Sequence, residues 1–242
     1  MKFILKSLLA RTGYRMIRQS DMNRFQAIDA CMHGLAERAY RPRVIIDGGA
    51  HVGQFAVLAR KSFAGAEAFH LFEPQQACLP QLRKLCAREG FILHECALSS
   101  QSGTLRFAST DRPSTGASVV QDDAPASEVV ACTLDEVLAG RLEPGHRSLL
   151  KLDLQGHELD ALRGGEKLLH AVEVVLIEAY FYSQSQSRVS AAMEVIAFMG
   201  SSGFVLYDIA SLSGRPRDNR LREADFVFVR QNSQLLADCQ WD

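Results

Sequence analysis

The sequence predicts an α/β protein built on a mostly parallel sheet that ends in an antiparallel hairpin. From residue 43 onward, short apolar runs alternate with helical patterns, which is the order typical of strand–helix units. No helix separates the last two apolar runs, 204–210 and 225–230, so these strands must pair antiparallel, because a parallel pair needs a long crossover. The length of 242 residues fits one large domain of this kind.

The expected elements follow one another in a regular order. Seven strands make up the expected sheet: 44–47, 68–73, 91–96, 148–153, 172–178, 204–210 and 225–230. Helices for its two faces are expected at 54–62, 75–89, 133–140, 157–169 and 189–201. Two further strands, 105–109 and 128–133, flank a polar loop, and loops of that length are commonly functional. Thr133 and Glu136 have the spacing of a capping box, which marks a helix start.

The composition is that of an ordinary globular protein. A formal net charge of −1 gives no indication of a nucleic-acid partner. The cysteines show no CxxC pair and no cluster at metal-ligand spacing, so no metal site is expected. Most of them fall in apolar or helical stretches, where a buried free thiol is the usual state, and this favours a reducing cytoplasm. The six are Cys31, Cys78, Cys86, Cys96, Cys132 and Cys239.

Residues 1–42 are expected to form a helical extension before the main domain, residues 43–242. The first 20 residues carry Lys and Arg but no acid, and Ile4, Leu5, Leu8 and Leu9 fall on one helical face. Such a basic amphipathic helix could contact an anionic membrane, cover the substrate or pack on the domain. Its apolar run is too short to span a bilayer, and no later segment is expected to cross one.

The turn after the first strand has the features of a site for a nucleotide-like ligand. Asp47 ends the strand, and Gly49 and Gly53 lack the Cβ atoms that would keep a ligand away from the backbone. A dinucleotide fingerprint would need glycine where His51 and Gln54 stand, and the GK[ST] of a P-loop is absent. An acid two residues before the first critical glycine is typical of S-adenosylmethionine sites. We therefore expect Asp47, Gly49, His51 and Gly53 to bind this cofactor.

The ends of the next two strands carry further candidates. Glu73 ends the second strand, at the sheet edge where open α/β folds bind ligands. Its two acceptor oxygens suit the two ribose hydroxyls of the cofactor, although a Glu before Pro is also an ordinary cap. Glu95, near the end of the third strand, is expected to face the adenine, with a solvent-facing Glu as the alternative.

The segment KLDLQGHEL, residues 151–159, gathers polar groups at one strand tip. Asp153 ends the strand where the transferred methyl group should lie, so it is expected to contact the cofactor and to act in catalysis. His157 is a candidate general base for a substrate hydroxyl. The alternative is a local ion pair of Lys151 with Asp153 and a helix cap by His157. Glu178, at the tip of the next strand, is a further catalytic candidate.

The chain resembles the FkbM-type methyltransferase family over about residues 43–230, in the strings VIIDGGAHVGQFAVLA, FEP, STGAS, TLDEVL, KLDLQGHELDALRGG and VVLIE. The resemblance implies a Rossmann-like class I methyltransferase fold that uses S-adenosylmethionine. It implies methylation of a hydroxyl on a sugar, glycan or natural product, with an amine acceptor as the alternative. It also implies that the loop 114–118 lies near the active site.

Two positions depart from the family pattern, which commonly has Asn at the position of His51 and Glu at the position of Gln155. An amide neither ionises nor binds cations strongly, so Gln155 could not replace a Glu that served as base or metal ligand. Catalysis then relies on Asp153, His157 or Glu178, or the chain binds the cofactor without methylating an acceptor. An NAD-linked oxidoreductase is disfavoured by the glycine spacing and the terminal hairpin.

Overall fold

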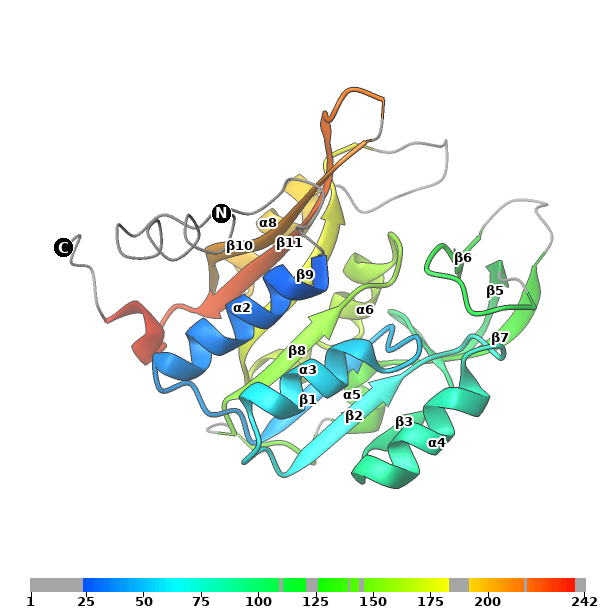
Figure 1. Cartoon of the computed structure of the whole chain (residues 1–242), viewed down its shortest axis with the longest axis horizontal. Helices are drawn as coiled ribbons and strands as arrows, with labels where there is room; N and C mark the ends of the chain where they lie inside the picture. Colours follow the sequence, from blue (N-terminus) through cyan, green and yellow to red (C-terminus); the bar gives the residue numbers. More distant parts are fainter. Residues whose placement is uncertain are drawn as a thin grey trace, which may run out of the picture.

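The computed structural model describes residues 24–108, 111–120, 126–138, 140–143, 146–182, 192–215 and 217–237. The basic helix expected in the first 20 residues lies outside the described residues, as do the first residues of the helix expected at 189–201. The described part of the chain forms a large sheet covered by helices, with a smaller sheet at one end (Figure 1).

The central sheet has seven strands: β1 (Val44–Gly48), β2 (Ala68–Phe72), β3 (Ile92–His94), β8 (Ser148–Leu152), β9 (Val172–Tyr180), β10 (Phe204–Gly214) and β11 (Leu221–Arg230). They lie in the order β10-β11-β9-β8-β1-β2-β3. Neighbouring strands are parallel except at β11, which is antiparallel to both β9 and β10. The predicted mostly parallel sheet with a C-terminal antiparallel hairpin is confirmed.

Helices cover both faces of this sheet. One face carries α2 (Arg24–Glu37), α3 (Gln54–Ser62), α4 (Leu79–Glu89) and the 3-10 turn η2 (Gln234–Leu236). The other carries α5 (Leu134–Leu138), α6 (Glu158–Arg163), α7 (Glu166–Leu169) and α8 (Ala192–Ser201). None of these helices in the described residues is long and apolar enough to cross a membrane.

The inner strands are buried on both faces, which explains their unbroken apolar sequences. Ile45 of β1 and Leu149 of β8 belong to the core beneath α2 and α3, whereas Ile46 and Leu150 belong to the core on the opposite face. Successive side chains of a strand point to opposite faces, so a strand covered on both sides needs apolar residues at every position.

Two expected helices depart most from their predicted bounds. The helix expected at 157–169 is divided into α6 and α7 around Gly164, where a Cβ atom would lie 2.0 Å from the carbonyl oxygen of Ser99. The helix expected at 75–89 begins only at Leu79, with Pro80 in its first turn. Proline favours the first turn because it lacks the N–H that a helix interior needs. Gln75 is thereby left outside the helix.

The interruption in the strand–helix order forms a second sheet. It consists of β4 (Ala97–Leu98), β5 (Gly103–Ala108), β6 (Ser118–Val119) and β7 (Ser127–Cys132), in the order β4-β7-β5-β6. Phe107, Val129 and Ala97 make its small core. Figure 1 shows this small sheet beyond the carboxyl ends of β1 and β2.

The expectation that the cysteines are free thiols is wrong for two of them. Cys96 and Cys132 form a disulfide with a Cα–Cα distance of 6.3 Å. Parallel pairing of β4 with β7 brings the two residues together, and their separation of 36 residues carries no pattern that would predict this. Cys31, Cys78 and Cys86 are free, as expected, and Cys239 lies outside the described residues.

Candidate active site

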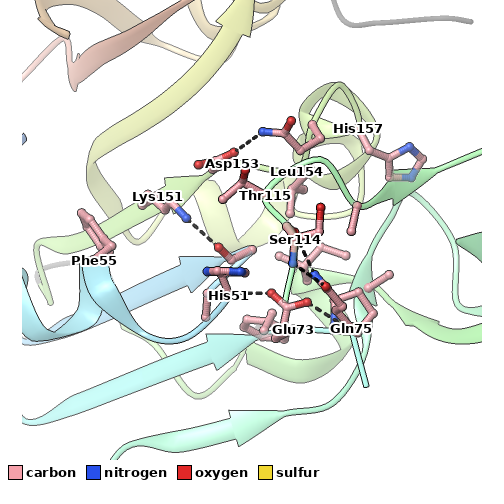
Figure 2. Close-up of a pocket in the computed structure, with 18 of the residues that line it drawn as sticks. His51, Phe55, Glu73, Gln75, Ser114, Thr115, Lys151, Asp153, Leu154 and His157 are labelled. Atoms are coloured by element: carbon pink, nitrogen blue, oxygen red, sulfur yellow. Dashed lines mark hydrogen bonds between the residues drawn. The ribbon is translucent and has the colours of Figure 1, made fainter. Parts of the chain in front are cut away.

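A pocket lies at the carboxyl ends of β1, β2 and β8, and residues of α2 and of the small sheet also line it. Figure 2 shows its polar side chains. Five of the predicted site residues line it: Gly49, His51, Glu73, Asp153 and His157. The remaining four are not among its lining residues: Asp47, Gly53, Glu95 and Glu178. Contacts in and around the pocket show what each of these side chains does.

The glycine turn brings the backbone of β1 against that of β8. Gly49 has a φ of +76°, and a Cβ atom there would lie 2.0 Å from the carbonyl oxygen of Asp153. Gly53 has a φ of +85°, but a Cβ atom there would meet the side chain of Leu85 in α4 at 2.1 Å. Gly49 is therefore required by the close approach of the two strand ends that border the pocket, and Gly53 by its packing against α4.

Asp47 stabilises the turn without lining the pocket. It is fully buried, and its Oδ1 accepts a hydrogen bond of 2.9 Å from Nζ of Lys151. The same Nζ also donates to the carbonyl oxygens of Gly48 at 3.2 Å and Gly49 at 2.8 Å. The ion pair therefore joins the tips of β1 and β8 and fixes the path of the turn, while Lys151 also lines the pocket (Figure 2).

The carboxylate of Glu73 holds two backbone segments at the pocket. One oxygen accepts the N–H of His51 at 2.7 Å and the other accepts the N–H of Gln75 at 2.8 Å. Burial raises the pKa of Glu73, and these two hydrogen bonds oppose that rise. Glu95 differs, because both of its oxygens pair with Arg83 at 2.6 Å on the exposed surface.

The two pocket histidines have different surroundings. Nε2 of His51 is buried and has no hydrogen-bond partner among the described residues, and burial followed by the charge of Lys151 lowers its pKa. Nε2 of His157 lies 3.1 Å from Oγ of Ser99, and burial lowers its pKa as well. Figure 2 shows the imidazole of His157 turned away from Asp153 and Lys151. Both rings are therefore neutral near pH 7.

Asp153 lies in the polar centre of the pocket. Its Oδ2 accepts from Nη1 of Arg24 at 2.8 Å, and its Oδ1 accepts from the amide of Gln155 at 2.9 Å. Burial alone would raise the pKa of Asp153, but the charges of Lys151 and Arg24 hold it well below its usual range. Burial and the neighbouring Asp153 raise the pKa of Glu178. Asp153 is therefore the ionised member of this pair.

The polar loop that follows β5 forms one wall of the pocket, through Ser114, Thr115 and Ala117. The side-chain amide of Gln75 donates to the carbonyl oxygen of Ser114 at 3.0 Å and accepts its N–H at 2.8 Å. Gln75 is buried, so these two hydrogen bonds are shielded from water. The loop is thus tied to the end of β2, two residues after Glu73.

Sequence reasoning missed three residues that shape this site: Arg24, Gln75 and Asp225. Arg24 contacts Asp225, a residue 201 positions away, with Nε at 2.7 Å and Nη2 at 2.5 Å. One sequence signal was available for Asp225, which is an acid at the start of the apolar run expected to form the strand 225–230. Arg24 and Gln75 lie in ordinary polar surroundings in the sequence and carry no such signal.

A mostly parallel sheet with this terminal hairpin, and a pocket at the glycine turn of its first strand, define a class I methyltransferase. The chain matches the methyltransferase FkbM domain over residues 47–206. It therefore belongs to the FkbM methyltransferase family, as the sequence resemblance predicted.

Comparison with solved structures finds similar chains. An FkbM methyltransferase from Methylobacillus flagellatus is 17% identical with a TM-score of 0.51, and the match covers 76% of this chain but only 43% of that chain. An S-adenosylmethionine-dependent methyltransferase from Clostridium acetobutylicum is 8% identical with a TM-score of 0.48, covering 88% of this chain and 94% of that one. An rRNA methylase from Streptococcus thermophilus is 14% identical with a TM-score of 0.45, covering 89% and 98%. Comparison with curated proteins gives no match.

Proposed function

We propose that this chain transfers the methyl group of S-adenosylmethionine to a hydroxyl group on a sugar, a glycan or a natural product. One observation carries the proposal: the glycine turn, the carboxylate of Glu73 and the ionised carboxylate of Asp153 meet in a single pocket at the carboxyl edge of the sheet. Ligands of open α/β folds bind at this edge.

The residues present suit the cofactor. The missing Cβ of Gly49 lets the backbone of Asp153 pack against the turn, so the carboxylate of Asp153 and the turn lie together at the pocket. Glu73 accepts only one backbone hydrogen bond on each oxygen, which leaves lone pairs for two ribose hydroxyls. His51 presents a buried nitrogen without a partner among the described residues. When bound, the cofactor supplies an electrophilic methyl group on a sulfonium.

Asp153 is the residue best placed to receive the acceptor hydroxyl. Its carboxylate is ionised and lines the pocket, so it accepts a hydrogen bond from the hydroxyl and orients the oxygen for in-line attack. The proton of that oxygen becomes strongly acidic as the new carbon–oxygen bond forms, so a carboxylate with a low pKa is able to take it. His157 is less suited to this role because its Nε2 faces Ser99.

Cofactor binding is tested first, by calorimetric titration of the full chain with S-adenosylhomocysteine and separately with NAD. We expect binding of S-adenosylhomocysteine only, weakened at least tenfold by Glu73→Gln. The matched control is Glu95→Gln, which makes the same change at an exposed residue and should leave the affinity unaltered. Binding of NAD alone would contradict the proposal.

Transfer is tested with S-adenosylmethionine labelled in its methyl group and a fractionated pool of cellular glycans and small metabolites. The label should enter as an ether methyl group, and Asp153→Asn should abolish the transfer while S-adenosylhomocysteine still binds. If the label is found on an amine instead, the acceptor is an amine and the proposal of a hydroxyl acceptor is wrong. Cofactor binding without any transfer would favour a non-catalytic binding protein.

A further inference from the structure

Two nitrogen atoms, one from Arg24 and one from Gln155, join Asp153 to Glu178. Nη1 of Arg24 lies 2.8 Å from Oδ2 of Asp153 and 3.0 Å from Oε1 of Glu178. Nε2 of Gln155 donates to Oδ1 of Asp153 at 2.9 Å and to Oε2 of Glu178 at 2.8 Å. Gln155 donates a hydrogen bond to each carboxyl group, whereas Arg24 donates a hydrogen bond to Asp153 and forms an ion pair with Glu178. The four side chains form a closed ring.

Both donors are themselves held in place. The hydroxyl of Tyr180 donates to Oε1 of Gln155 at 3.0 Å, which turns the nitrogen of the amide toward the two carboxyl groups. The other two nitrogens of Arg24 bind the two oxygens of Asp225 at 2.7 and 2.5 Å. Asp225 is buried in β11 and also accepts from Ser211 of β10. The ring is therefore fixed from both sides.

We propose that Arg24 and Gln155 are positioning residues that hold Asp153 toward the methyl acceptor. The amide of Gln155 is then needed for methyl transfer, although the family commonly has Glu at this position. This inference rests on the proposed function, in which Asp153 receives the acceptor hydroxyl. A glutamate at position 155 has no hydrogens to donate when ionised, so it would break two bonds of the ring. It would also place a third carboxyl group beside Asp153 and Glu178.

The charges around Asp153 agree with this role. Arg24 from α2 and Lys151 from β8 are the cations near it, and the neighbouring acids are Glu178 from β9, Asp47 from β1 and Glu158 from α6. Asp225 and Glu223 of β11 add two further acids around Arg24 and Glu178. The amide of Gln155 is neutral and adds no charge to this group, whereas an acidic side chain at position 155 would add a negative charge.

The helix α2, which carries Arg24, also forms part of the pocket wall. Arg24, Phe25 and Ile28 of this helix line the pocket, although the family match begins only at residue 47. Asp225, the anchor of Arg24, follows the end of that match at residue 206. The two segments that flank the family domain therefore meet over the pocket and complete the surroundings of Asp153.

The first test is a carbon-13 NMR titration of the Asp and Glu carboxyl groups in the full chain, from pH 5 to pH 8, with Asp153→Asn to assign the signal. In the native chain, Asp153 should stay ionised over this whole range. Arg24→Met should shift the carboxyl signal of Asp153 and raise its pKa, whereas Arg24→Lys, which keeps the charge, should change both less. Thermal unfolding confirms that each variant is folded. An Asp153 signal that is the same in the native chain and in Arg24→Met would overturn the inference.

The second test compares methyl transfer by the native chain, Gln155→Glu and Gln54→Glu, using the labelled cofactor and the acceptor pool. Gln155→Glu should transfer at least tenfold more slowly at pH 8 and recover part of that loss at pH 6, where the new carboxyl group takes up a proton. Gln54→Glu adds the same charge at another pocket residue and should have a smaller effect. Tyr180→Phe, which only frees the amide of Gln155, should slow transfer a few-fold.

A Gln155→Glu variant that matches or exceeds the native rate would show that the amide is a defect and would overturn the inference. Failure of the proposed function is recognised separately. In that case S-adenosylhomocysteine would not bind the native chain, or it would bind and the native chain would transfer no label, whereas the carboxyl titration needs neither cofactor nor transfer.

Discussion

Lys151 and Asp47 form a buried ion pair with an Nζ–Oδ1 distance of 2.9 Å, which joins two strand tips 104 residues apart in the sequence. Replacing one partner of a buried pair leaves the other charge without compensation. Lys151→Met should therefore lower the free energy of unfolding by about 3–5 kcal/mol, measured by urea denaturation. Arg43→Met is the control, because it removes an ion pair with Glu67 that is exposed on both sides. Equal losses in the two variants would contradict the assigned role of Lys151.

Gly49→Ala should abolish binding of S-adenosylhomocysteine, or weaken it more than tenfold, in a calorimetric titration. The added Cβ would lie 2.0 Å from the carbonyl oxygen of Asp153, and the positive φ is unfavourable for alanine. Gly90→Ala gives a matched comparison, since Gly90 has a φ of +72° but no atom within 4 Å of its Cβ position. That variant should lose roughly 1 kcal/mol of stability and keep its affinity. Similar affinities in both variants would argue against a ligand at the turn.

Gln75→Leu should loosen the loop that forms the pocket wall. The substitution removes both hydrogen bonds between Gln75 and the backbone of Ser114. Amide hydrogen exchange in residues 111–120 should become at least tenfold faster, followed by mass spectrometry of the full chain. Gln75→Glu keeps the acceptor for the Ser114 N–H but loses the donor, so its exchange should be intermediate. Unchanged exchange in both variants would show that the loop is held by other contacts.

The buried Glu158 should make stability depend on pH. Burial raises the pKa of Glu158 from 4.5 to about 7. Between these values the unfolded chain releases a proton that the folded chain keeps, so stability falls as the pH rises through this window and then stays lower. Relative to Glu158→Gln, the native chain should lose roughly 3 kcal/mol between pH 4.5 and pH 7, measured by urea unfolding at each pH. If the free energy of unfolding changed with pH in the same way in both proteins, the raised pKa of Glu158 would be disproved.

Much of the fold could be predicted because it follows from patterns among neighbouring residues. The observed bounds of α3 equal the predicted 54–62, and the final strands pair antiparallel as expected. The capping box is present, with Glu136 N–H donating to Thr133 Oγ1 at 3.0 Å. Apolar periodicity, turn residues and caps act over a few positions, so the sequence itself displays them.

The missed parts of the site depend on which distant polar groups meet. Gln75 meets Ser114 only because the helix after β2 starts late, and Cys96 meets Cys132 only because β4 pairs with β7. Asp47 was expected at the ligand, yet its carboxylate is turned to Lys151, since both lie at neighbouring strand tips. The apolar periodicity of a sequence indicates which residues are buried, but it does not indicate which residue pairs with a buried charged side chain.

The segment that forms the small sheet begins and ends at nearly the same point, because the Cα atoms of Cys96 and Cys132 at its two ends are 6.3 Å apart. An insertion with adjoining ends behaves as a cassette that can be exchanged without altering the path of the chain around it. Substituting residues 97–131 with the corresponding segment of a relative would change the wall formed by Phe107, Thr115 and Val119 and leave the glycine turn intact. Relatives that differ within residues 97–131 would therefore differ in this pocket wall and keep the same glycine turn.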